Sequence, residues 1–419
     1  MGDTTDDASW IRVLARVIDA AHIVVADRLA ATVDDAVSGV GLTADVLVAD
    51  ASQLVLTSMS SAGETRMDLV TTLAGRAFQL GEILPGTGED GERLLWVPIL
   101  DGTDRIGVLR IGLGADDRDD DPALRQRVWS LAGLVGHVVA TKSVYSDRLR
   151  RWRVDGAVSA PSELLWQLLP PLTFATDRVV VSAILEPHDQ VAGDAFDYNV
   201  DGDVIDLAAL DAAGHDLRAS VTTALAITAL RNARRSGEQD LVAIAAHADA
   251  LIATQAGSRQ FATAVLARLD TATGELAMLN AGHPPPLLVR GGKVIKELGP
   301  PPRPPLGVTL LPGRSATAAV SHDQLEPGDR LLLYTDGITE ARDASGTFFG
   351  EERLVEFTEH AAASGLSAPE TLRRLTAAVL AHQGGRLQDD ATLLLVEWSP
   401  EAYLRMLPSG LQLDLGRDR

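Results

Sequence analysis

At several places in this chain, an aspartate stands where an apolar segment of β-type composition meets a turn. This pattern limits the folds that the chain can adopt. One segment runs into Asp211, another runs into Asp336, the last leads out of Asp389, and Asp194 follows a turn at Gly193. A strand that meets a glycine-containing turn at an aspartate carries the carboxylate at the rim of a sheet. We therefore expect strands whose ends bring these four carboxylates together.

Carboxylates contributed by several strands suit hard cations such as magnesium and manganese. Ala212 adds a backbone carbonyl next to Asp211, which is a further oxygen ligand for such an ion. An aspartate at a strand end is most often only a turn former, so the metal prediction rests on the four residues together. Asp389 is followed by Asp390, and neighbouring side chains on a strand point to opposite faces. We expect one of the two to reach the site and the other to serve as a surface or hydrogen-bonding group.

Size and composition narrow the class of protein. A chain of 419 residues favours two domains over one core. The net charge of −21 argues against nucleic acid and against an anionic membrane as partners. The polar N-terminus and the lack of a long apolar stretch indicate a cytoplasmic protein without a signal peptide. The absence of cysteine excludes disulfides, thiolate metal sites and cysteine nucleophiles.

The first part of the chain, residues 8–140, has the pattern of a small α+β sensor domain. Helical spacing of apolar residues comes first, followed by β-type runs at 45–56 and 94–113. The second run folds back at residues 101–104, which predicts a hairpin, and a short helix between the two runs stops at Gly81. Helices and a hairpin in this order form an α+β unit because each apolar face needs a layer to cover it.

Residues 121–170 form a helical linker that overlaps the end of this domain. A helix begins at Asp121 and Pro122, and its apolar residues recur in steps of four and three from Leu124 to Leu149, with an interruption at Lys142. That stripe is typical of a parallel coiled coil, and we predict a homodimer through it. The alternative is one amphipathic helix packed on its own domain. A second helix, residues 161–169, follows and is the predicted switch helix.

Residues 172–399 contain strands and helices in an order that fits a second domain, and residues 400–419 have the character of a loosely held tail. The second domain carries five separated motifs, which are AGDAFDY at 192–198, DAAGHD at 211–216, NAGHPP at 280–285, YTDGITEAR at 334–342 and DDAT at 389–392. In this order the motifs resemble the SpoIIE/RsbU-like branch of the PPM-type metal-dependent protein serine/threonine phosphatases. The resemblance spans residues 160–398. It implies an αββα sandwich with a centre of two divalent metal ions, manganese or magnesium.

Carried over by position, the resemblance implies that Asp194 and Asp211 flank both metals, with Asp211 bridging them and the Ala212 carbonyl binding one. Asp336 and Asp389 would complete the metal ligands. The implied reaction is hydrolysis of phosphoserine or phosphothreonine on a regulatory protein of anti-anti-sigma (STAS) type by a metal-activated water, regulated by the N-terminal domain.

This sequence departs from the usual pattern at Ala192, where the family has glycine, and at Asp216, where glycine is commoner. His215, Asp216 and Arg218 are candidates for contact with a phosphate or with a water beyond the metal ligands. For His283, a turn histidine with local hydrogen bonds is favoured over a catalytic role. Arg342, like Arg218, is a candidate for a phosphate contact, with an ordinary surface arginine as the alternative.

The N-terminal domain resembles a GAF domain in its element order and in the hairpin at residues 94–113. The resemblance implies binding of an unknown small ligand, with dimerisation as the alternative. Two other functions stay open for the whole chain. One is a two-metal hydrolase of small phosphoesters or nucleic acid, and the other is a scaffold that binds a phosphoprotein without hydrolysing it.

Overall fold

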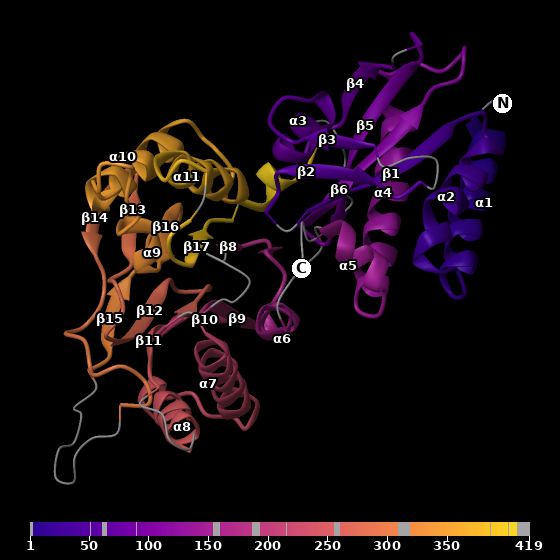
Figure 1. Cartoon of the computed structure of the whole chain (residues 1–419). Helices are drawn as coiled ribbons and strands as arrows, with labels where there is room; N and C mark the ends of the chain where they lie inside the picture. Colours follow the sequence, from indigo (N-terminus) through magenta and orange to yellow (C-terminus); the bar gives the residue numbers. More distant parts are fainter. Residues whose placement is uncertain are drawn as a thin grey trace. The chain divides into compact units, whose positions relative to one another are not determined.

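The computed structural model describes residues 3–50, 52–60, 65–88, 90–153, 160–186, 193–214, 216–254, 260–308, 319–385, 387–400 and 402–408. The chain divides into two compact units (Figure 1). The first comprises Met1–Gly156 together with Leu404–Arg419, and the second comprises Ala157–Tyr403. Within the described residues, no helix has the length and apolar character needed to cross a membrane.

The first unit is built on a six-stranded antiparallel sheet with the strand order β3-β2-β1-β6-β5-β4. Its β5–β6 hairpin turns at Gly102, where the sequence predicts the turn. The run predicted at residues 45–56 is two strands with a turn between them. The strands are β1 (Thr43–Ala49), β2 (Val55–Ser58), β3 (Arg66–Asp68), β4 (Leu84–Thr87), β5 (Arg93–Asp101) and β6 (Asp104–Gly112).

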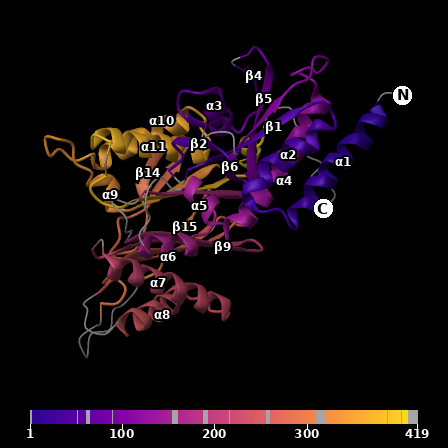
Figure 2. The same ribbon diagram turned by 45° about the vertical axis from the view of Figure 1, so that its right-hand side comes forward.

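Helices cover both faces of this sheet because its strands are apolar on both. On β1, Val46 and Val48 pack with the helices of one face, whereas Leu47 and Ala49 pack with those of the other. The first face carries α1 (Asp3–Ala21), η1 (Ala26–Arg28), α2 (Leu29–Ser38) and α4 (Pro122–Ser143), and the second carries α3 (Leu73–Leu80). Figures 1 and 2 show α3 on the opposite side of the sheet from α1 and α2.

The predicted dimer seam is wrong for α4. Its stripe from Leu124 to Val138 is buried in the core of its own unit, against β5 and β6. The helix ends at Ser143, and Leu149 belongs to a separate helix, α5 (Asp147–Arg153), where it too is buried. The spacing of four and three is therefore that of an amphipathic helix whose apolar face covers a sheet.

Lys142, which interrupts the stripe, has a structural role. Its side chain is buried, and its ammonium group donates to the carbonyl of Ala21, the last residue of α1, at 2.9 Å and to the Tyr145 hydroxyl at 3.2 Å. The last carbonyls of a helix lack partners within the helix, so a cation there satisfies one of them.

The C-terminal segment differs from the loosely held tail predicted for residues 400–419. Residues 402–406 form a 3-10 helix, η2 (Ala402–Met406), and Met406 is buried. The Met406 carbonyl lies 3.4 Å from the position that a Cβ would take at Gly81, which ends α3 in a left-handed conformation as predicted. Residues 409–419 lie outside the described residues.

The second unit contains two antiparallel sheets. The five-stranded sheet has the order β15-β12-β11-β10-β9, and the six-stranded sheet has the order β14-β13-β16-β17-β8-β7. The five-stranded sheet consists of β9 (Asp194–Asp201), β10 (Val204–Ala212), β11 (Ala262–Asp270), β12 (Glu275–Ala281) and β15 (Ser321–Gln324). The six-stranded sheet consists of β7 (Thr173–Ala175), β8 (Val179–Glu186), β13 (Leu287–Arg290), β14 (Lys293–Glu297), β16 (Asp329–Tyr334) and β17 (Ala391–Trp398).

These sheets form the two inner layers of an αββα sandwich, as the resemblance implies. Phe196 of β9 and Leu394 of β17 belong to one core between the sheets. The outer face of the five-stranded sheet packs on α7 (Leu217–Arg235) and α8 (Leu241–Ala253), and α10 (Gly350–Ala363) and α11 (Ala368–His382) cover the other sheet (Figure 1). Two further helices are α6 (Ala160–Leu168) and the short α9 (Asp336–Thr339).

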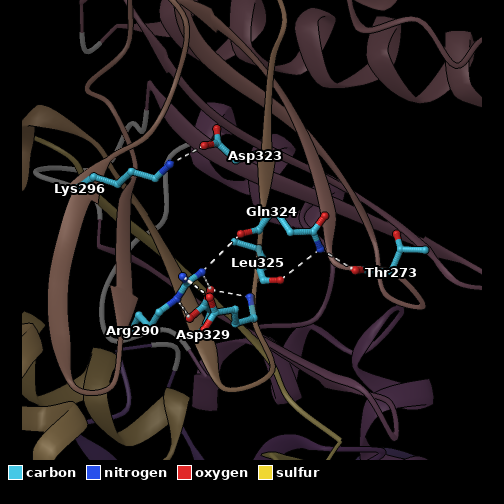
Figure 3. Close-up of polar contacts among 8 residues, drawn as sticks. Thr273, Arg290, Lys296, Asp323, Gln324, Leu325 and Asp329 are labelled. Atoms are coloured by element: carbon cyan, nitrogen blue, oxygen red, sulfur yellow. Dashed lines mark hydrogen bonds and ion pairs between the residues drawn. The ribbon is translucent and has the colours of Figure 1, made fainter.

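Charged side chains join the edges of the two sheets (Figure 3). Lys296 of β14 pairs with Asp323 of β15 at 2.6 Å. The Arg290 guanidinium of β13 contacts both oxygens of buried Asp329, at 2.9 and 2.6 Å, and donates to the Gln324 carbonyl of β15 at 3.4 Å. The Arg290–Asp329 contact lies within the six-stranded sheet, and its two points orient the guanidinium that reaches β15.

Candidate functional site

Two carboxylates face each other at one end of the five-stranded sheet. Asp194 is the first residue of β9, Asp211 is the next-to-last residue of β10, and the two are direct partners in the antiparallel register. Asp194 is buried and Asp211 is half-buried. Like charges directly opposite each other on a sheet repel, and either a proton held by the pair or a bound cation relieves that repulsion.

The six-stranded sheet contributes the remaining carboxylates. Asp336 begins α9, two residues after β16 ends, and Asp389 and Asp390 immediately precede β17. Because β16 and β17 pair in an antiparallel register, these residues lie at the same end of the two strands. The sequence places Asp336 at a strand end, and the structure places it at the start of a short helix that follows the strand.

Thr335 connects the two sheets at this point. Its hydroxyl donates to the Asp194 carboxylate at 2.6 Å and accepts from the Thr392 backbone amide at 2.9 Å. Thr335 and Asp194 are both buried. Sequence reasoning missed Thr335 because its contact crosses between sheets, and only its place beside Asp336 gives a signal in the sequence.

Asp390 anchors the loop that carries Asp194. Its carboxylate accepts a hydrogen bond from the Gly193 amide at 2.6 Å, and its side chain is buried. Asp390 thus has the hydrogen-bonding role that the sequence predicts for one member of the Asp389–Asp390 pair, and metal binding by Asp389 stays a prediction. The pair precedes β17, so the alternation of a strand does not apply to it.

Glycine is required at two positions where backbones press together around the carboxylates. A Cβ on Gly193 would lie 2.8 Å from the Gly214 carbonyl and 3.0 Å from the Ala212 carbonyl. A Cβ on Gly337 would lie 1.8 Å from the Asp390 carbonyl. The first approach joins the loops next to β9 and β10, and the second joins the loops next to β16 and β17, so each lies at the end of one sheet.

The carboxylates perturb one another. Burial, followed by the charges of Asp336, Asp389 and Asp390, raises the pKa of Asp211 to about 7. Burial and the charges of Asp211 and Asp390 hold the pKa of Asp194 well above its usual range. Burial and the charge of Asp389 also raise the pKa of Asp336. Clustered carboxylates with raised pKa values are typical of a functional site.

Comparison with known proteins identifies this part of the chain. Residues 201–399 match the family model of Stage II sporulation protein E (SpoIIE). This region is a SpoIIE-family PP2C phosphatase domain. It forms most of the αββα sandwich and includes Asp211, Asp336, Asp389 and Asp390.

Each of the following matches to an individual relative covers only part of this chain and only part of that relative. The chain is 31% identical over 150 residues to protein IcfG of Synechocystis sp. (strain ATCC 27184 / PCC 6803 / Kazusa), a match that covers 35% of the chain and 22% of IcfG. The match thus spans about a fifth of that relative's length. Among solved structures, the SiaA-PP2C domain of Pseudomonas aeruginosa is 24% identical with a TM-score of 0.46, over 52% of this chain and 86% of that one. The RsbU and RsbW domains of Rv1364c from Mycobacterium tuberculosis are 27% identical with a TM-score of 0.45, over 55% and 62%.

The donor chemistry of the SpoIIE-family domain fits divalent cations. Its clustered side chains offer only carboxylate oxygens, and their mutual repulsion is what a bound cation would relieve. In the described residues, no group of three or more acidic or histidine side chains is arranged so that it could already hold a metal ion. The carboxylates therefore lie near one another, but their oxygens do not surround a common position for an ion.

The metal-free SpoIIE-family domain should lose stability as pH rises. Asp211 has a folded-state pKa of about 7, against about 3.9 in an unfolded chain, so the folded state binds the extra proton between these values. The contribution is fully present below about pH 4 and is lost as pH rises through 7. His283, whose pKa burial lowers to about 4, acts in the opposite sense below pH 6.5. We expect the melting temperature of Asp211→Asn in EDTA to rise relative to wild type as pH increases from 5 to 8, and a constant difference would contradict this.

The remaining predicted site residues have other positions. His215 and Ala192 lie outside the described residues. Asp216 is exposed and caps α7, accepting hydrogen bonds from the amides of Arg218 at 2.9 Å and Ala219 at 3.1 Å. Arg218 is exposed in the first turn of the same helix. Contact of these side chains with a phosphate stays a prediction.

His283 makes the local hydrogen bonds that the sequence favours for it. It is buried, its Nδ1 lies 2.8 Å from the Thr263 hydroxyl, and its backbone is bonded to the Asn280 side chain at 2.9 and 2.8 Å. Thr263 is the register partner of Asp211 on β11. His283 thus supports the strand beside the carboxylates from within the core.

Proposed function

We propose that this protein is a metal-dependent serine/threonine phosphatase that hydrolyses phosphoserine or phosphothreonine on a regulatory protein. The observation that carries the proposal is the cluster of carboxylates from both sheets, with raised pKa values and with loops held in place by Thr335 and Asp390. Membership of the SpoIIE family supports the same reaction.

Two divalent cations, manganese or magnesium, are the proposed cofactors. Asp194, Asp211, Asp336, Asp389 and the carbonyl of Ala212 would hold them. Bound there, such ions supply Lewis-acid activation of a water and offset charge on the phosphoryl oxygens.

The chain's own residues prepare this site. The Thr335 hydroxyl occupies one oxygen of Asp194 and thereby fixes the direction of the other. Asp390 is proposed as a positioning residue, because its carboxylate is already bonded to the Gly193 amide. The sandwich core behind these loops keeps the two sheet ends at a fixed separation.

The proposed substrate is a phosphorylated regulator of the anti-anti-sigma (STAS) type, as the resemblance to the SpoIIE/RsbU-like branch implies. The excess of acidic residues in the chain disfavours a nucleic-acid substrate. Regulation by the first unit is proposed to act through α6, which precedes the sandwich in the chain. Arg231 of α7 links the carbonyl of Leu168 in α6, at 2.6 Å, to Asp197 of β9, the strand that starts at Asp194.

Turnover of p-nitrophenyl phosphate and of a phosphoserine peptide by the full chain tests the proposal. We expect both to be hydrolysed with manganese or magnesium and neither with EDTA. Hydrolysis of p-nitrophenyl phosphate alone, with no phosphopeptide or phosphoprotein accepted, would favour a hydrolase of small phosphoesters. Binding of phosphoprotein without any turnover would favour the scaffold.

A further inference from the structure

A tight turn follows the helix that starts at Asp336. Arg342 and Phe348 pair as an isolated antiparallel bridge at its base. The side chain of Asp343 accepts hydrogen bonds from the amides of Ser345 at 2.8 Å and Thr347 at 2.9 Å. This internal bonding gives the turn a defined shape although its side chains are mostly exposed.

The base of this turn adjoins the carboxylate cluster. The Gln388 side chain donates to the Arg342 carbonyl at 2.9 Å, and Gln388 directly precedes Asp389. Asp389 in turn lies close enough to Asp336 to raise its pKa. Arg342 is therefore fixed, through its own backbone, to the segment that carries one of the proposed metal ligands.

The Arg342 guanidinium lies over the aromatic ring of Phe348. Its central carbon lies 4.5 Å from the centroid of Phe348, whose side chain is 46% exposed. Stacking on a ring orders the arginine and leaves the N–H groups at its edge available for an anion. Among the residues that the structure describes, no carboxylate or carbonyl accepts a bond from this guanidinium.

Most of the second unit's arginines that the structure describes are engaged differently. Arg231 and Arg290, for example, hold carboxylates within the fold. Arg342 differs from them because its side chain is exposed and, among the residues that the structure describes, has no carboxylate partner, so its charge is available to an anion from outside.

We propose that Arg342, held on Phe348, binds the phosphate group of the substrate at the rim of the carboxylate cluster. The inference rests on the proposed phosphatase function and adds a substrate-binding residue to it. A guanidinium makes charge-assisted, two-point hydrogen bonds to phosphate oxygens. The Phe348 ring keeps the guanidinium oriented before substrate arrives, so less conformational freedom is lost on binding.

Steady-state kinetics of Arg342→Ala on p-nitrophenyl phosphate test the proposal. We expect the KM and the inhibition constant of inorganic phosphate to rise together by about 10- to 100-fold, the effect of losing a hydrogen-bonded charge. The kcat at saturation and the manganese concentration for half-activation should change by less than about threefold. Arg342→Lys should recover only part of the loss because lysine cannot make the two-point contact, and Phe348→Leu should cause a smaller rise.

Arg235→Ala is the matched control. Arg235 is exposed at the last residue of α7, about 27 Å from the start of that helix, whose first turn adjoins the Asp194 loop. We expect its constants to equal those of wild type. The proposal is overturned if Arg342→Ala behaves like Arg235→Ala. It is also overturned if Arg342→Ala mainly lowers kcat and shifts the manganese requirement, because that result would mark a structural role.

A binding measurement separates this proposal from the proposed function. Inorganic phosphate titrated against the magnesium-loaded full chain and followed by phosphorus NMR should bind wild type at least about tenfold more tightly than Arg342→Ala. Wild type that binds phosphate in this way but hydrolyses no phosphoester would sink the phosphatase function and leave the Arg342 site standing. Equal affinity of the two proteins, or no binding by wild type, would sink the site.

Discussion

Replacing Asp211 or Asp336 by asparagine should lower turnover by about a hundredfold or more at saturating manganese. Each substitution keeps the shape of the side chain and removes one charge from the carboxylate cluster, in which these residues are neighbours. The measurement is kcat/KM on p-nitrophenyl phosphate across a manganese titration. Near-normal turnover of both variants would falsify the two-metal site.

Thermal unfolding distinguishes loss of metal from loss of fold in the same variants. Without metal, Asp211→Asn should be more stable than wild type near pH 8, because a neutral amide relieves repulsion with Asp194 across the sheet. With manganese, wild type should gain stability by ligand binding, whereas the variant should gain little. Less stability than wild type in EDTA at pH 8 would mean that Asp211 supports the fold rather than a metal.

Asp201→Asn is the matched control for these measurements. Asp201 is the last residue of β9 and is exposed, so it stands at the other end of the strand that begins at Asp194. Seven residue steps along a strand separate the two by roughly 23 Å. We expect wild-type turnover and a wild-type manganese requirement from this variant.

The sequence predicts the gathering of Asp194, Asp211 and Asp336 from local signals at the strand ends, and the αββα sandwich is implied by the resemblance that the motifs carry. The turn residues at the strand ends and the order of the motifs can both be read from the sequence. Thr335 and Asp390 act on residues of the other sheet, Asp194 and Gly193, which are more than a hundred positions away in sequence. Contacts of that kind depend on strand pairing, which no local pattern specifies.

The apolar stripe of α4 shows a different limit. Residues such as Leu124, Val128 and Leu131 recur at a spacing that fits a coiled coil and a helix lying on a sheet equally well. The spacing defines which face is apolar and does not define what covers it. Here the β5–β6 hairpin of the same unit covers it. The break after Ser143, which separates Leu149 from the stripe, has no proline or glycine to mark it.

Replacing Asp197 by alanine should destabilise the sandwich by about 3–5 kcal/mol, which is the usual cost of breaking a buried ion pair from one side. Asp197 is fully buried and accepts from Arg231 at 3.0 and 2.7 Å and from Arg234 at 2.6 Å. Removing it leaves two largely buried guanidinium groups of α7 without this partner. Asp206, whose carboxylate is 4.0 Å from Arg234, is already bonded to Arg268 at 2.8 Å, so it can compensate only in part.

Urea unfolding measures this effect, and Asp203→Ala supplies the matched control. Asp203 forms an exposed pair with Arg178 at 2.8 Å, and its loss should cost less than about 1 kcal/mol. Hydrogen exchange should also quicken in α6 and β9 of Asp197→Ala, because Arg231 binds the Leu168 carbonyl and Asp197 together. Equal destabilisation by the two substitutions would show that burial of the ion pair does not determine the loss in the free energy of unfolding. Unchanged exchange in α6 would break the proposed link between that helix and the strand that carries Asp194.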